Sequence, residues 1–221
     1  MDDQPVAPVS DTDWRDGFVF VANQLSLDFV NTKPVINGIA VEMLPDAAAL
    51  ARWLAAAELI SAGQGRELAR TWLGKGGDDI ARIQEFREAL RAVVFELESG
   101  LDLAGGFLRM INELLLRYPL AEQLEYSSEG LRRVRRFDPF GPADAFAPLV
   151  NQVVDLLVCA NRSRIRKCDS CALHFLDTSK KGLRRWCSMQ ICGNRHKVAA
   201  YAKRTREGRQ GLFSLPQGEV G

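Results

Sequence analysis

Apolar residues recur every three or four positions through much of the first 160 residues, a spacing typical of helices packed on a shared core. The clearest stretch is 78–98, where seven large apolar side chains keep this spacing. The same spacing predicts helices over 47–59, 105–117 and 144–159, with Asp46 as the N-cap of the first. We therefore expect a body built mainly from helices.

Short β-forming segments interrupt this helical pattern. Residues 18–22 form an apolar run that predicts a strand, and residues 35–41 place two such segments around Asn37-Gly38, the favoured dipeptide of a two-residue hairpin turn. Residues 120–137 lack a helical spacing and predict a second hairpin. The expected fold class is therefore α+β: mainly α with short β-hairpins, and a small module after the helical domain.

Charge changes this picture, because it is distributed unevenly along the chain. The net charge of the whole chain is only +1, yet residues 162–209 contain 14 Lys or Arg and 3 Asp or Glu, a net charge of +11. The remainder therefore carries −10. A split of this kind indicates a basic module that contacts a polyanion, joined to an acidic globular body.

Four cysteines within the basic segment follow the pattern C-x2-C-x15-C-x4-C: Cys168, Cys171, Cys187 and Cys192. Two close thiol pairs at this separation are typical of a tetrahedral Zn²⁺ site, and four thiolates leave no position for a catalytic water. The pattern predicts one structural zinc ion. His174 and His196 are alternative ligands that would make a three-cysteine, one-histidine site.

These signals predict three parts in the chain. Residues 1–160 are expected to form an acidic, α-rich effector domain, 161–210 a zinc finger, and 211–221 a flexible tail. Within the finger, Asn194 is the predicted N-cap of a helix that follows it, with Val198 and Tyr201 facing inward.

Six finger residues are the candidate nucleic-acid contacts: Arg184, Arg185, Asn194, Arg195, Lys197 and Arg204. Each cation placed against a phosphate adds affinity that does not depend on base sequence. DNA is the expected partner, and RNA is an alternative polyanion. The alternative to nucleic-acid binding is that these cations form a solvated basic face, or that the finger docks on an acidic protein partner or on the chain's own body.

Two stretches resemble known families. The run 184–197, Arg-Arg-Trp-Cys-Ser-Met-Gln-Ile-Cys-Gly-Asn-Arg-His-Lys, resembles the CGNR zinc finger, and Phe-Leu-Asp-Thr-Ser at 175–179 also fits it. The run 23–32, Asn-Gln-Leu-Ser-Leu-Asp-Phe-Val-Asn-Thr, looks like the opening motif of the ABATE domain, which precedes this finger in bacterial proteins. The resemblance implies a stress-responsive transcription regulator, with the same four cysteines as zinc ligands, a DNA-binding finger and an N-terminal domain that senses a ligand or partner.

The body offers little chemistry of its own. Residues 1–160 contain no histidine, no Gly-rich phosphate loop and no Ser-His-Asp order, so we expect no enzyme. Asp28 and Asn31 are polar positions in an apolar stretch; they either line a ligand pocket or cap a helix.

The sequence has neither a leader with a basic start and an apolar stretch nor an apolar run long enough to span a membrane. It therefore predicts a cytoplasmic protein that does not enter membranes. A homodimer would raise DNA affinity, but no heptad pattern argues for one.

Overall fold

The computed structural model describes residues 13–36, 38–158, 160–195, 197–198, 201 and 205. The helices, in chain order, are α1 (Leu25–Val30), α2 (Ala47–Ala56), α3 (Ala62–Thr71), α4 (Gly77–Glu98), α5 (Gly105–Arg117) and α6 (Phe146–Val158). Short turns of other helix types cover Pro142–Ala145, Arg162–Arg164 and Met189–Gly193. No helix in the described part of the chain is long and apolar enough to cross a membrane.

The strands of the described residues pair only with their nearest neighbours in sequence, as antiparallel two-stranded sheets. The pairs are β1 (Trp14–Arg15) with β2 (Phe18–Val19), β3 (Val35–Ile36) with β4 (Ile39–Ala40), β5 (Ala121–Ser127) with β6 (Gly130–Arg136), and β7 (Ile165–Lys167) with β8 (His174–Leu176). A mainly helical fold with small hairpins is thus confirmed, including the hairpins expected around residues 37 and 128.

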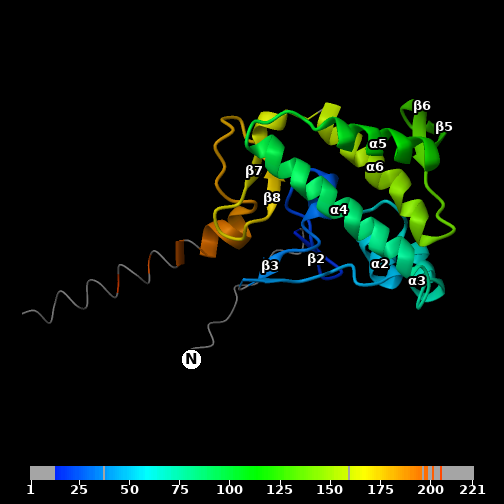
Figure 1. Ribbon diagram of the computed structural model, residues 1–221, viewed down its shortest axis with the longest axis horizontal. Coiled ribbons are helices and arrows are strands. Elements are labelled where there is room, and N and C mark those ends of the chain that lie inside the picture. Colours follow the sequence, from blue (N-terminus) through cyan, green and yellow to red (C-terminus); the bar gives the residue numbers. More distant parts are fainter. Residues whose placement is uncertain are drawn as a thin grey trace, which may run out of the picture.

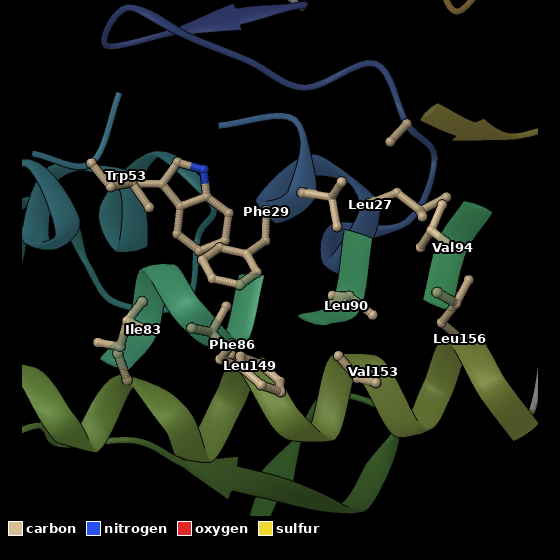
Figure 2. Close-up of a cluster of buried hydrophobic side chains, with 14 of the residues drawn as sticks. Leu27, Phe29, Trp53, Ile83, Phe86, Leu90, Val94, Leu149, Val153 and Leu156 are labelled. Atoms are coloured by element: carbon tan, nitrogen blue, oxygen red, sulfur yellow. The ribbon is translucent and has the colours of Figure 1, made fainter. Parts of the chain in front are cut away.

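Helix α4 runs through the middle of the molecule (Figure 1). Figure 2 shows its apolar side chains between two layers: α6 lies on one side, and α1 with α2 on the other. Leu90 of α4, Leu27 of α1 and Leu149 of α6 are almost completely buried in this core. The apolar spacing over 78–98 therefore predicted the central helix correctly, because α4 is buried on more than one face.

Aromatic rings connect the layers across α4. The Phe29 ring of α1 lies 5.6 Å from Trp53 of α2 and 6.2 Å from Phe86 of α4, measured between centroids. Phe86 in turn lies 5.6 Å from Phe146, at the start of α6. Tilted and edge-on pairs of this kind each add about 0.5–1.5 kcal/mol beyond the burial of their surface. The chain of rings fixes the spacing between α2, α1, α4 and α6.

A buried arginine ties the segment after α1 to α4. Arg87 has no exposed surface; it donates to Thr32 Oγ1 at 3.0 Å and to both carboxylate oxygens of Glu42. Burial alone would raise the pKa of Glu42, but the hydrogen bonds from Arg87 and from the Leu44 N–H, together with the charges of Arg87 and Lys33, lower it overall. A charge buried at this depth is tolerated because it is paired and hydrogen-bonded.

Two features of the body were not predicted from the apolar pattern. Helix α2 ends at Ala56 rather than at residue 59, because Glu58 has a φ of 60°, outside helical geometry. Helix α3 follows at once, although its residues are mostly polar. Its start is marked instead by a capping box, in which Ser61 accepts from the Gln64 backbone N–H and the Gln64 side chain accepts from the Ser61 N–H.

Close packing of α3 on α2 depends on Gly65. A Cβ at this position would lie 2.5 Å from Ala55 Cβ and 3.4 Å from the Ala51 carbonyl oxygen. Gly65→Ala should therefore lower the free energy of unfolding by about 1–3 kcal/mol through overpacking. Urea denaturation would measure the loss. The matched control is Gly63→Ala on the same helix, where the nearest atom to a Cβ is 3.9 Å away and higher helix propensity should leave stability equal or raised. Equal effects of the two substitutions would contradict this account.

Candidate metal centre

The four cysteines converge on one point. Their sulfur atoms all lie within 4.8 Å of one another. Cys171 Sγ is 3.5 Å from Cys187 Sγ, which is 3.7 Å from Cys192 Sγ. A tetrahedral zinc with Zn–S bonds of about 2.3 Å requires sulfur separations of about 3.8 Å. The cluster therefore fits a single Zn²⁺ held by four thiolates.

The first cysteine pair lies on the loop between β7 and β8. The Cys168 N–H donates to the Leu173 carbonyl at 2.8 Å, and the Ala172 N–H donates to the Cys168 carbonyl at 3.1 Å. Ala172 has a φ of 60°, a left-handed conformation that favours glycine and costs about 1 kcal/mol for other residues. This turn closes the C-x2-C loop and directs Cys168 and Cys171 to the same side.

The second pair is held by a helical turn over Met189–Gly193. Ser188 is its N-cap and accepts from the Ile191 N–H, while the Cys192 N–H donates to the Ser188 carbonyl at 3.0 Å. The prediction that Asn194 is the N-cap is therefore wrong: the turn has already begun, and Asn194 has helical dihedral angles. The x4 spacing matches this single turn, which places Cys187 and Cys192 on one side.

Comparison with protein families gives two matches, in the order expected from the sequence. Residues 164–205 match the CGNR zinc finger, and residues 23–159 match ABATE, described as "putative stress-induced transcription regulator". The second match spans more than half of the chain. The chain belongs to the ABATE family. No curated protein matches it. The cysteine geometry and the CGNR match together give one structural zinc as its cofactor.

His174 does not join the cysteine cluster of the CGNR finger. Its ring is buried against the ABATE region, edge-on to Phe95 with centroids 4.8 Å apart, and its Nε2 lies 3.4 Å from Glu98 Oε2. Burial lowers the pKa of His174 despite the nearby carboxylate. The alternative zinc ligand thus serves the contact between finger and body; His196 lies outside the described residues.

The sequence-predicted contacts of the CGNR finger divide into two groups. Arg184 is half-buried: its guanidinium donates to the Cys187 carbonyl and lies 5.1 Å from the Phe175 ring centroid. Arg185 is exposed, but it pairs with Asp169, with Nε 2.7 Å from Oδ2, and lies beside Trp186. The residues of the other group have no ion pair among the described residues or lie outside them. Asn194, Arg195 and Lys197 are exposed, whereas Arg204 lies outside the described residues.

The helical segment after Cys192 differs from expectation in one further respect. Val198 and Tyr201, predicted to face inward, are 63% and 68% exposed. The segment closes tightly at Gly193, where a Cβ would lie 2.8 Å from the Met189 sulfur. The exposure of these two side chains has no explanation in the contacts of the described residues.

The opening motif of the ABATE region holds the finger. Asn31 Oδ1 accepts from the His174 N–H at 3.0 Å, and Asn31 Nδ2 donates to the His174 carbonyl at 2.8 Å. The Leu176 N–H donates to the Ala22 carbonyl at 2.8 Å, and Asn23 Nδ2 donates to the Leu176 carbonyl at 3.0 Å. These four hydrogen bonds attach β8 to α1 and the loop before it. Sequence reasoning missed this role, since no local spacing connects residues so far apart in the chain.

Asp28 also binds the chain's own backbone. Its Oδ1 accepts from the N–H groups of Val21 and Ala22, both at 3.0 Å. Its side chain is buried, as is that of Asn31. The ligand-binding interpretation of these two residues therefore gains no support from their positions, because protein groups already occupy the polar atoms described here.

The buried carboxyl of Asp28 predicts a specific pH dependence. Burial raises its pKa from 3.8 to about 7, against the opposing hydrogen bonds from Val21 and Ala22. Because the folded protein holds this proton more tightly than the unfolded chain, stability should fall as pH rises through about 4 to 7. In Asp28→Asn this pH-dependent part of the free energy of unfolding, on the order of a few kcal/mol, should be absent. Urea unfolding of both proteins across this range would measure it; a difference that stays constant with pH would contradict the prediction.

Proposed function

We propose that this protein is a DNA-binding regulator of transcription, whose zinc-stabilised finger contacts the phosphate backbone and whose ABATE region senses a ligand or protein partner. The proposal rests on one observation. Among the described residues, no arginine or lysine of 162–198 forms an ion pair with a carboxylate of 13–158. The acidic body therefore leaves the cations of the finger available to another polyanion.

The contact between finger and body supports the same proposal. It is made by neutral hydrogen bonds to β8, by Glu98 accepting from the Lys167 backbone N–H at 2.9 Å, and by Ser188 donating to Asp13 at 2.7 Å. On the finger's side, backbone groups and the Ser188 hydroxyl make these hydrogen bonds, so hydrogen bonding to the body engages no guanidinium or ammonium of the described residues 162–198. Arg195 and Lys197 stay exposed. Exposed cations without carboxylate partners are the feature that phosphate contacts require.

Neither proposed role calls for catalysis, and a closed four-thiolate site supplies no open metal position. We therefore propose that the protein is not an enzyme. Thiolate ligands also require a reducing compartment, which agrees with a cytoplasmic protein.

Fluorescence anisotropy of the zinc-loaded full chain with duplex DNA across a salt series tests the proposal. The logarithm of the affinity should fall linearly with the logarithm of salt concentration, and Arg195→Ala with Lys197→Ala should flatten the slope by about two. The matched control removes two exposed cations, Arg66 of α3 and Lys75 in the loop after it. Helix α3 lies at the other end of the molecule from β7 and β8 (Figure 1). Absent binding, or binding indifferent to salt, would reject DNA as the partner.

A second candidate function is a zinc-stabilised module that binds a protein and does not contact DNA. The observation that favours it is the exposure of Val198 and Tyr201, 63% and 68% of whose surfaces are accessible. Exposed apolar side chains surrounded by basic residues are typical of a surface that binds an acidic protein partner. If DNA binding is absent, substitution of Tyr201 by Ser should weaken capture of such a partner.

A further inference from the structure

The loop between β8 and the second cysteine pair is unusually well supported for a surface segment. We name residues 177–184 the braced loop. Its first residue, Asp177, is completely buried, and its carboxylate accepts from the Ser179 N–H at 2.9 Å and from the Arg184 N–H at 2.8 Å. One buried carboxylate therefore joins the beginning of the loop to its end.

Arg164 supports the middle of the braced loop from outside. Its Nη1 donates to the Ser179 carbonyl at 2.6 Å and to the Asp177 carbonyl at 3.3 Å. Gly182 closes the turn: its N–H donates to the Ser179 carbonyl at 3.2 Å, and its φ of 65° favours glycine. A Cβ on Gly182 would lie only 3.4 Å from Arg164 Cζ. Backbone, carboxylate and guanidinium thus fix the path of this loop.

The fixed backbone presents two adjacent cations to solvent. Lys180 and Lys181 are both exposed, and neither pairs with any carboxylate of the described residues. The two carboxylates nearest in sequence are already engaged, since Asp177 is buried in the loop and Asp169 pairs with Arg185. Leu183, at 76% exposed, also points away from the protein. The bracing therefore does not bury Lys180, Lys181 or Leu183.

We infer that the braced loop is a phosphate-contact site of the finger, in which Lys180 and Lys181 bind the nucleic-acid backbone in addition to Arg195 and Lys197. This inference rests on the proposed function and adds a second element to its binding surface. A preformed loop loses little conformational entropy on binding, so the attraction of its lysines for phosphates is retained in the affinity. Two of the sequence-predicted contacts, Arg184 and Arg185, already have partners inside the finger.

Figure 1 is consistent with a shared binding surface. The strands β7 and β8 and the segment after them lie at one end of the molecule, away from α2 and α3 at the other end. The body would thus lie behind the finger when a duplex contacts this end. Long lysine side chains suit this contact, because a flexible ammonium follows phosphates without demanding a fixed geometry.

The test is a salt series of DNA affinity on zinc-loaded full-length protein with Lys180→Gln and Lys181→Gln combined. Loss of two phosphate contacts should flatten the logarithmic salt slope by about two and weaken binding roughly 10- to 100-fold at about 0.1 M salt. Lys180→Arg with Lys181→Arg should retain both slope and affinity. Arg66→Gln with Lys75→Gln, the same charge change far from the finger, should leave the slope unaltered.

The outcomes separate the two proposals. If the unmodified chain does not bind DNA, the proposed function fails. If it binds and the Lys180→Gln, Lys181→Gln protein keeps the full salt slope, the braced loop is not a contact and only this inference is overturned. Zinc content and unfolding temperature are measured on each protein, and the single substitutions replace the pair if the double variant is unstable. A flattened slope at unchanged zinc content supports the inference.

Discussion

Replacing Cys187 with serine is expected to abolish zinc binding and to unfold the finger. Cys187 is buried, and its sulfur lies 3.5 Å from that of Cys171 and 3.7 Å from that of Cys192. Structural zinc contributes about 10–16 kcal/mol in isolated finger peptides, so its loss exceeds what the few apolar contacts of the finger can offset. Finger residues Ile165 and Phe175 have no exposed surface and belong to the same apolar core as α1 and α4. The body should therefore be destabilised as well.

Two measurements check this prediction. Zinc content should fall from one ion per chain to none, and the unfolding temperature should fall by roughly 10 °C or more. Removing zinc from the unmodified chain with a chelator should reproduce both changes. Ser170→Ala, within the same C-x2-C loop, is the control and should retain zinc. Full zinc content in the Cys187→Ser protein, or an unchanged unfolding temperature, would refute a four-thiolate site that stabilises the whole molecule.

The second large effect is expected from Asn31→Ala. This substitution removes both hydrogen bonds between the side chain and β8, and it leaves the His174 N–H and carbonyl buried without partners. Each unsatisfied buried group costs about 1–3 kcal/mol, so we expect the free energy of unfolding to fall by about 2–5 kcal/mol. Unlike loss of zinc, it should act mainly on the attachment of the finger to the body.

Hydrogen exchange distinguishes attachment from general stability. Amide protons of β7 and β8 should exchange faster in Asn31→Ala, while those of α4 should change less. Zinc content should stay at one ion per chain. The matched control is Asn151→Ala, because Asn151 also donates to a carbonyl, that of Ala147, but lies on α6 away from the finger. If exchange of β8 is the same in the two variants, Asn31 does not hold the finger.

Sequence reasoning worked where local spacing determines structure. Helix α4 and the hairpin of β5 and β6 were predicted because apolar periodicity and a turn are properties of neighbouring residues. The zinc site was found for the same reason, since four thiols of suitable spacing have one common use. Helix α3 was missed because it is mostly polar; its capping box at Ser61 and Gln64 was the signal that could have found it.

The roles of individual polar residues could not be found this way, because they depend on partners far along the chain. Asn31 contacts a residue 143 positions away, and the sequence gives no sign of that pairing. Arg184 and Arg185 illustrate the same limit. A count of charges does not tell which cations bind their own finger, and only the structure separates them from Lys180 and Lys181.

If the chain binds DNA as proposed, the four hydrogen bonds that join Ala22, Asn23 and Asn31 to β8 have a consequence for gene control. A finger attached in this way keeps one orientation relative to its body, unlike a finger on a flexible tether. Bound to an operator, the body would always face the same side of the duplex. Moving that operator by half a helical turn, about 5 base pairs, would then turn the body to the opposite side, whereas a full turn of about 10.5 base pairs would restore it. Regulation by such a protein would depend on helical phase as well as on distance.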